Sequence, residues 1–267
     1  MEYSDTSNNQ KSEIKLKSNL DNIKNDYFLQ KVMNNLSKKE TLEIIKYNKK
    51  IKERLNININ DYKEYCKKYS SIEIELIPIK NKYGPFINIK EGDKLYSHIY
   101  FNDNKEEEIK RYELKENDIV HKINIIIDYQ IVSFCGLFFG CECIESIYLK
   151  RFYRNNVNDM SGMFAKCPSL KEINLSNFNI NNVTDMSGMF YECSSLKEIN
   201  LSNFNTNNVT DMSNMFYECS ALKEINLSNF NVNNVIYIRG MFFGCSDEIK
   251  MKIKEQIKNI KEEAYNN

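Results

Sequence analysis

The stretch that decides the fold is LKEINLSNFNINNVTDMSGMFYECSS at residues 170–195, which residues 196–221 repeat as LKEINLSNFNTNNVTDMSNMFYECSA. The same 26-residue period places one cysteine in every row. This column consists of Cys141, Cys167, Cys193, Cys219 and Cys245. A fixed period between about 20 and 50 residues predicts a solenoid, in which one supersecondary unit stacks on copies of itself. Asn-rich low-complexity sequence is the alternative, but it would not keep large apolar residues in fixed columns.

Each row is expected to contain a short strand, a loop, a short helix and a second loop. In the strand, Ile199 and Leu201 alternate with polar residues, which is the period of a strand with one buried face. The apolar residues of the expected helix recur at i, i+3, i+4 and i+7, and in one row they are Met186, Met189, Phe190 and Cys193. Thr184 or Asp185 would be the N-cap of this helix. Residues 203–208 are the return loop, because Asn tolerates turn backbone.

Polar residues that alternate with the strand core form regular columns on the outer face of the strands. The two columns singled out are Glu172, Glu198 and Glu224, and Asn174, Asn200 and Asn226. In the first row Tyr148 replaces the Asn. Repeat proteins use such extended faces to bind partners, and an exposed aromatic side chain is a frequent hot spot. We therefore predict that these seven residues bind a partner, with Tyr148 as the best single anchor.

The repeated row resembles the BspA-type leucine-rich repeat, and more specifically the 26-residue "surface protein" repeat of mycoplasma lipoproteins. Leu170, Ile173 and Leu175 match the L-x-x-L-x-L strand of that family, while Phe178 stands where ordinary leucine-rich repeats have Asn or Cys. The resemblance covers residues 131–245 and implies an α+β fold, a leucine-rich-repeat-like solenoid of short parallel strands plus short helices. It leaves the function open, because the family includes adhesins, binding proteins and uncharacterised members.

The flanking sequence divides into four further segments. Residues 1–18 are polar and are expected to form a disordered tail. Residues 19–70 have helical periodicity, with a capping box at 37–40, and predict a small helical unit. Residues 71–130 alternate apolar and polar positions and predict a small β module that covers the open edge of the first repeat. After the repeats at 131–246, residues 247–267 predict a capping helix that begins after Ser246 and packs through one stripe of isoleucines.

Residues 27–55 resemble an F-box, the helical unit that precedes leucine-rich repeats in ubiquitin-ligase adaptors. The run from Phe28 to Ser37 occupies the place of the first conserved run of that family. Asp26 and Tyr27 stand where the family has Leu-Pro, and the chain contains no Trp. The resemblance implies binding to a Skp-type linker protein. A helical cap or an independent helical hairpin is the alternative, because amphipathic helices are common.

The cysteine column is expected to be a ladder of structural thiols. Strand spacing would allow disulfides between rows, but no export signal follows Met1, so we expect a reducing compartment. A free cysteine then behaves as a small buried hydrophobe. Zinc is not expected at the Cys-x-Cys sequence 141–143, since only two histidines could complete a site. The column of Asp159, Asp185 and Asp211 could suggest calcium, but one carboxylate per row is typical of helix caps and falls short of calcium's oxygen ligands.

Composition narrows the function. Lys and Arg number 37, as do Asp and Glu, so the net charge is zero and gives no case for nucleic-acid binding. No apolar run approaches the length that spans a membrane. No histidine follows His121, so the repeats cannot form a His-based triad, and no phosphate-loop motif occurs. We therefore expect a cytoplasmic, monomeric, non-enzymatic protein without cofactor or metal that acts as a protein-protein interaction scaffold. An F-box-like substrate adaptor of a ubiquitin ligase and a BspA-type surface adhesin remain the alternatives.

Overall fold

The computed structural model divides the chain into two compact units, Met1–Cys66 and Lys67–Asn267. It describes residues 22–36, 41, 44, 48–55, 70–128, 130–152 and 154–266. The predictions of a tail at 1–18 and of a capping box at 37–40 lie outside the described residues. Each unit is described by itself.

The first unit contains two described helices, α2 (Asp26–Asn35) and α4 (Lys49–Arg54). The side chain of Asn25 begins α2 by accepting hydrogen bonds from the N–H groups of Tyr27 and Phe28. Leu29 and Met33, one helical turn apart, are buried with Ile44 and Ile51 in a small apolar cluster. The region 19–70 thus contains a helix at 26–35, which buries Leu29 and Met33 and leaves Tyr27 and Phe28 exposed.

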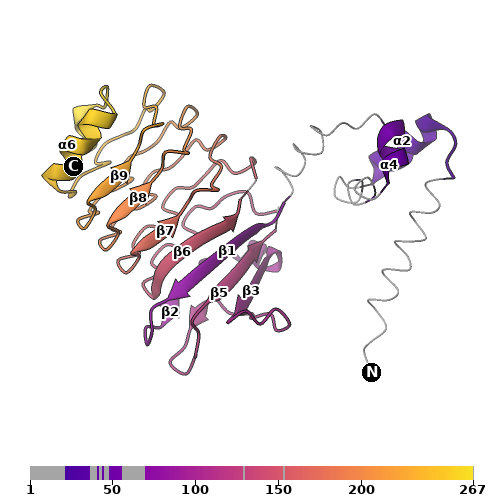
Figure 1. Ribbon diagram of the computed structural model, residues 1–267, viewed down its shortest axis with the longest axis horizontal. Coiled ribbons are helices and arrows are strands. Elements are labelled where there is room, and N and C mark those ends of the chain that lie inside the picture. Colours follow the sequence, from indigo (N-terminus) through magenta and orange to yellow (C-terminus); the bar gives the residue numbers. More distant parts are fainter. Residues whose placement is uncertain are drawn as a thin grey trace. The chain divides into compact units, whose positions relative to one another are not determined.

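The second unit begins with a mixed sheet that joins the segment before the repeats to the first repeat (Figure 1). Its strand order is β3-β5-β1-β6-β7, with bounds β1 (Ile72–Pro78), β3 (Ser97–Phe101), β5 (Ile123–Ile127), β6 (Ile144–Arg151) and β7 (Glu172–Asn174). A two-stranded sheet and a 3-10 helix complete this part, namely β2 (Gly84–Pro85), β4 (Glu113–Leu114) and η1 (Glu91–Tyr96). β1 runs antiparallel to β6, and β6 runs parallel to β7, with Leu76 opposite Ile147 and Ile147 opposite Ile173. The N–H and C=O groups along the outer edge of β6 are thus paired by β1.

Successive rows then lie side by side in a register of 26 residues. β8 (Glu198–Asn200) pairs in parallel with β9 (Glu224–Asn226). On the opposite side of the rows, single parallel bridges connect Ser133, Asp159, Asp185, Asp211 and Tyr237. Buried phenylalanines stack from row to row, with Phe164 and Phe190 5.4 Å apart and Phe190 and Phe216 5.3 Å apart between ring centroids. The architecture is mixed α/β, with several strands in sheets and few helices.

The expected short helix in each row is wrong, because residues 161–166 and their equivalents form consecutive turns. Gly162 and Lys166 have φ angles of 57° and 54°, a left-handed backbone that interrupts an α-helix. Hydrogen bonds alternate accordingly. The N–H of Met163 donates within the row to Met160, whereas the N–H of Phe164 donates to Met189 in the next row. The apolar spacing still predicted burial correctly, because three-residue turns also return side chains to one face.

The predicted continuous pairing of the repeat strands is also wrong at one point. Within the described residues, β8 and β9 form a sheet of their own, and no ladder joins β7 to β8. Each of these strands has only three residues, so a ladder between β7 and β8 would add few hydrogen bonds. The phenylalanine column near the strands is also less regular at this point. The rings of Phe178 and Phe204 are inclined by 32°, but those of Phe204 and Phe230 by only 8°.

Helix α6 (Asp247–Gln256) lies against the last row (Figure 1). The side chain of Ser246 accepts a hydrogen bond from the N–H of Ile249, and Ile249 and Ile253 are fully buried. Gln256 ends the helix and takes the place of a further strand. Its Nε2 donates to the carbonyl of Ile225 at 2.9 Å, and its Oε1 accepts from the N–H of Leu227 at 2.7 Å.

The expected helix does not continue to residue 267, since a 3-10 helix, η2 (Glu262–Tyr265), follows α6 after a turn. The carbonyls of Glu263 and Ala264 accept hydrogen bonds from the N–H groups of Gly240 and Phe242. These are the bonds that a further row would make. The C-terminal segment therefore closes the exposed backbone of the last row with a helix, a glutamine side chain and a 3-10 turn.

Candidate partner-binding face

The strand face carries the predicted binding columns in regular order. β7, β8 and β9 each read Glu-Ile-Asn, and in each strand the Glu and the Asn are exposed. Ile199 and Ile225 are buried, as the period of two requires, but Ile173 is only half-buried. The face is therefore polar on the outside, with an apolar floor that becomes accessible at β7.

Six of the seven predicted residues line one groove of about 550 Å³ on this face. They are Glu172, Asn174, Glu198, Asn200, Glu224 and Asn226. The groove crosses the position where β7 and β8 are not paired, and its floor contains Ile173, Leu175 and Ile199. The tertiary structure thus brings the two columns together around one hollow.

Tyr148 differs from the role expected of it. Its side chain is half-buried rather than exposed, and it does not line the groove. Its hydroxyl donates to the Glu172 carboxylate at 2.8 Å, and this hydrogen bond raises the pKa of Tyr148. The Lys150 ammonium lies 5.0 Å from the centre of its ring. Tyr148 therefore orients Glu172 at the rim of the groove.

The asparagine column serves both the fold and the face. The Oδ1 atoms of Asn174 and Asn200 accept hydrogen bonds from the N–H groups of Ser176 and Ser202, each at 3.0 Å, and Asn226 repeats this turn. Such Asx turns fix the orientation of the carboxamide. Within the described residues, the Nδ2 groups of these three side chains make no hydrogen bond, so these donors remain unused on the face.

The three glutamates of the other column have different surroundings. Glu224 forms an ion pair with Lys252 of α6, with Oε1 and Nζ 2.9 Å apart. Glu172 accepts the Tyr148 hydroxyl. In the part of the chain that the structure describes, Glu198 has neither an ion pair nor a hydrogen bond from its side chain, although it lies at the centre of the column.

A comparison with known protein families matches the part of the chain that contains the repeats. A family model described as "Mycoplasma protein of unknown function, DUF285" matches residues 132–256. The match spans the rows and α6 and supports the expected similarity to mycoplasma-type repeats. No curated protein matches the chain, and no solved structure does. The family description assigns no function.

Sequence reasoning missed a second asparagine ladder that joins the rows. The Nδ2 groups of Asn208 and Asn234 each donate at 2.6 Å to the carbonyl of an Asn in the preceding row, and Asn182 makes the equivalent contact. The sequence indicated only turn residues here. The signal that could have revealed the ladder is the 26-residue recurrence of this Asn, since a residue needed only for a turn can be replaced by Gly, Asp or Ser.

The cysteine column is buried, and its thiols are free, as predicted. Each thiol from Cys167 onward donates to the carbonyl of a buried Phe, for example Cys193 to Phe164 at 3.1 Å. Burial raises the pKa of Cys167 to about 12 and that of Cys193 well above its usual range. These thiols therefore remain protonated and unreactive in the folded chain. Among the described cysteines, Cys135 is exposed.

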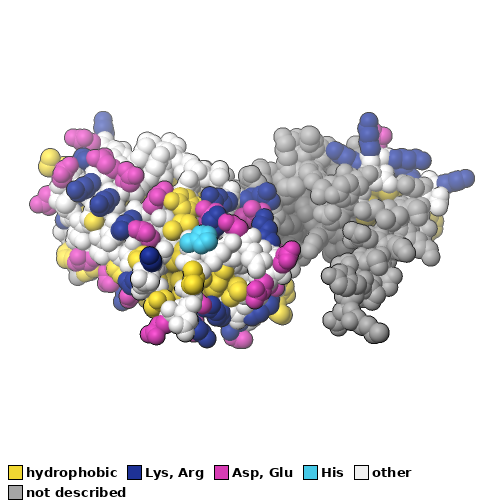
Figure 2. Space-filling view, turned by 60° about the horizontal axis from the view of Figure 1, so that its bottom comes forward, with side chains coloured by type: hydrophobic (Ala, Val, Ile, Leu, Met, Phe, Trp, Pro, Cys, Tyr) yellow, Lys and Arg dark blue, Asp and Glu magenta, His cyan; other side chains and the backbone are white. Residues whose placement is uncertain are grey.

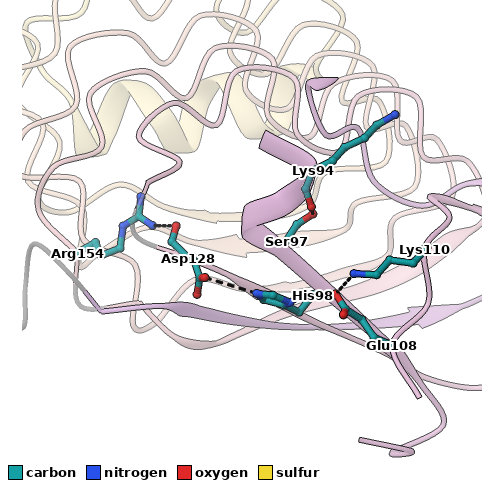
Figure 3. A network of polar contacts seen from close by, with 7 residues as sticks. All are labelled: Lys94, Ser97, His98, Glu108, Lys110, Asp128 and Arg154. Carbon is teal, nitrogen blue, oxygen red and sulfur yellow. Dashed lines mark hydrogen bonds and ion pairs between the residues drawn. The ribbon is translucent and has the colours of Figure 1, made fainter. Parts of the chain in front are cut away.

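A polar network lies at the junction between β5 and the first repeat (Figure 3). His98 on β3 stands between two carboxylates, with Glu108 2.9 Å from Nδ1 and Asp128 3.4 Å from Nε2. The ammonium of Lys110, 2.7 Å from Glu108, lowers the pKa of that carboxyl. The Ser97 hydroxyl donates to the Lys94 carbonyl, so it is not paired with His98. This network has no activated nucleophile and holds the junction together.

Arg154 anchors the other side of this junction and was not anticipated from the sequence. Its guanidinium is fully buried and donates to the carbonyls of Asp128 and Ile131. Desolvation lowers the pKa of Arg154 to about 10. The equivalent residues one and two rows later are Ile180 and Thr206, both buried. The signal that could have revealed this role is that Arg154 is a charged residue at a position where the next rows have Ile180 and Thr206.

Figure 2 shows acidic and basic side chains interspersed on one face of the described part, consistent with the zero net charge. Within the described residues, no group of three or more His, Cys, Asp or Glu side chains is arranged to hold a metal ion. The Asp159 carboxylate, for which calcium was considered, accepts from the N–H and hydroxyl of Ser161 instead. None of the helices in the described ranges has the length and apolar character needed to cross a membrane.

Proposed function

We propose that the chain is a non-enzymatic interaction scaffold that binds a protein partner with its strand face. The groove lined by Glu172, Glu198, Glu224 and the three Asn residues carries this proposal. It combines an apolar floor, carboxylate acceptors and oriented carboxamide donors, which is the mixture found at protein interfaces. The groove runs across three rows and so offers a partner an extended contact.

The finer classification is part of the proposal. We take the rows as a leucine-rich-repeat-like solenoid of the BspA type, supported by the 26-residue register and by the strand pattern Leu170, Ile173 and Leu175. A cytoplasmic location, a monomeric state and the absence of enzymatic activity also belong to the proposal. The engagement of the junction network and of the thiols in structural contacts supports the absence of enzymatic activity.

The test is capture of partners by the full chain from extracts of its native cell, followed by mass spectrometry. Ser176→Trp places a bulky side chain at an exposed position in the groove lining. Ser194→Trp is the matched control, because it makes the same substitution at an exposed position of the turns outside this groove. We expect a partner that is lost with Ser176→Trp and retained with Ser194→Trp. A partner that survives Ser176→Trp contradicts binding by the strand face.

An F-box-like substrate adaptor is the second candidate, and α2 favours it. Tyr27 and Phe28 are 68% and 59% exposed, and Val32 lies on the same side of the helix. An apolar face of this kind on a short helix is typical of a docking surface. Capture of a Skp–cullin complex by the full chain, lost on Tyr27→Ala and Phe28→Ala together, would favour the adaptor. The BspA-type adhesin remains the third alternative and would be favoured by an extracellular partner.

A further inference from the structure

The glutamate column already binds a cation in the last row. The Lys252 ammonium, reaching over from α6, lies 2.9 Å from Glu224 Oε1 and donates to the carbonyl of Lys223 at 3.0 Å. One carboxylate and one backbone carbonyl of the same row thus hold a lysine side chain, together with the Glu248 carboxylate of α6, which lies 3.0 Å from the same ammonium. Because the rows repeat, the chain itself shows which chemical group fits this position of a row.

A glutamate carboxylate and the backbone carbonyl of the preceding lysine also occur at β7, where no cation of the described chain binds them. In β9, the carbonyl of Lys223 is open to Lys252 because no further row pairs with it. At β7, where the ladder to β8 is missing, the carbonyl of Lys171, the residue before Glu172, accepts no hydrogen bond in the described part of the chain. In β8, by contrast, the carbonyl of Lys197 accepts from the N–H groups of the next row.

Charge at the groove is not balanced. Its lining contains three carboxylates and no Lys or Arg. Lys252 compensates Glu224, while Glu172 accepts only a neutral hydroxyl and Glu198 has no partner within the described residues. The Lys171 ammonium is turned to Glu145, 2.6 Å away, and so does not supply the missing charge. The groove therefore presents two uncompensated carboxylates on an apolar floor.

We propose that this groove takes a lysine side chain from a basic segment of the protein partner, with its ammonium at Glu172 and Glu198. This inference rests on the proposed function, because it names the partner chemistry of the same face. The aliphatic stem of a lysine suits the floor of Ile173 and Leu175, and its head suits the carboxylates. The groove, its two uncompensated carboxylates and the Lys252 contact at Glu224 together carry the inference.

The test is a titration of the full chain with hexalysine, followed by calorimetry at low salt. We expect binding that weakens about tenfold in the double variant Glu172→Gln and Glu198→Gln, which keeps the shape and removes both charges. Glu218→Gln makes the same kind of charge change on the turns outside this groove and is the control. It should bind as the unchanged chain does. Hexalysine with acetylated side chains should not bind.

The inference is overturned by equal binding of hexalysine to the double variant, by an equal loss of binding in Glu218→Gln, or by equal binding of the acetylated peptide. Tighter binding of hexa-arginine than of hexalysine also contradicts the choice of lysine. A cellular partner separates this inference from the scaffold itself. If Ser176→Trp releases that partner and the double Gln variant does not, the strand face binds a partner without using the carboxylates. If Ser176→Trp retains it, the scaffold proposal fails.

Discussion

The buried thiols should make the repeats unusually sensitive to alkaline pH. Six cysteines, namely Cys141, Cys143, Cys167, Cys193, Cys219 and Cys245, are buried. Burial raises the pKa of Cys143 and Cys245 to about 11 and that of Cys167 to about 12, and the pKa values of the other three rise well above the usual range. In the unfolded chain the pKa of a cysteine thiol is about 8.5. The two states therefore bind different numbers of protons above this pH.

Proton linkage gives the sign and the size of the change in unfolding free energy with pH. Because the pKa is raised in the folded state, the contribution of each thiol to stability is fully present below about pH 8.5 and is lost as the pH rises toward the folded pKa. Each thiol then costs about 1.4 kcal/mol per pH unit. Between pH 8.5 and 10 the loss is about 1.5 kcal/mol per thiol, and up to about 9 kcal/mol for all six. The total stability of a domain is only about 5–15 kcal/mol.

The assay is urea unfolding followed by circular dichroism at pH 7.5, 8.5 and 10. The unchanged chain should lose most of its stability at pH 10. Cys193→Ala and Cys219→Ala together remove two fully buried thiols. This variant will be less stable at pH 7.5 because of the cavities, but its stability should fall by about 3 kcal/mol less between pH 8.5 and 10.

Cys135→Ala is the control, because Cys135 is exposed and is solvated in both states. Its replacement should leave the pH dependence unchanged. If the double variant loses as much stability between pH 8.5 and 10 as the unchanged chain, the column thiols do not resist ionisation, and the reasoning from burial is refuted.

Three further predictions concern the fold. Leu201→Asp buries a carboxylate at a fully buried position, which costs at least several kcal/mol and should abolish cooperative thermal melting; an unchanged melting temperature would show that Leu201 is not in the core. Gln256→Ala removes the side chain that pairs the last strand and should lower the unfolding free energy by about 1–3 kcal/mol, whereas Glu255→Ala should not; equal effects would argue against pairing by Gln256. Gly244→Ala adds a Cβ 2.7 Å from the Glu218 side chain at a φ angle of 76°, so the melting temperature should fall, and an unchanged value would show that the turn adapts.

Much of the fold could be predicted from period and polarity. The columns of Met, Phe and Cys, the alternation around Ile199 and the helix start at Ser246 were all readable, and the structure buries or places them accordingly. The six Glu and Asn positions of the strand face were also predictable, because residues that alternate with a buried strand residue point outward.

The turn face shows where the sequence was ambiguous. The spacing of Met160, Met163 and Phe164 suits a helix, but it equally suits turns of three residues, because both return side chains to one side. The choice depends on where the N–H groups find acceptors. The N–H of Phe164 pairs with Met189, a partner 25 residues away that exists only when the rows are stacked. A local pattern cannot report this bond.

The sequence by itself determined the 26-residue register, the buried columns, the exposed Glu and Asn columns and the start of a helix after the last row. These features follow from periodicity and polarity, which are properties of the chain. Only the tertiary structure decided the remaining features. It leaves β7 and β8 without a ladder and places the groove across that position, with the half-buried Ile173 in its floor. It also decided that Tyr148 orients Glu172 and that Lys252 compensates Glu224. These contacts join segments far apart in the chain, and nearly identical rows therefore acquire different surroundings from their neighbours.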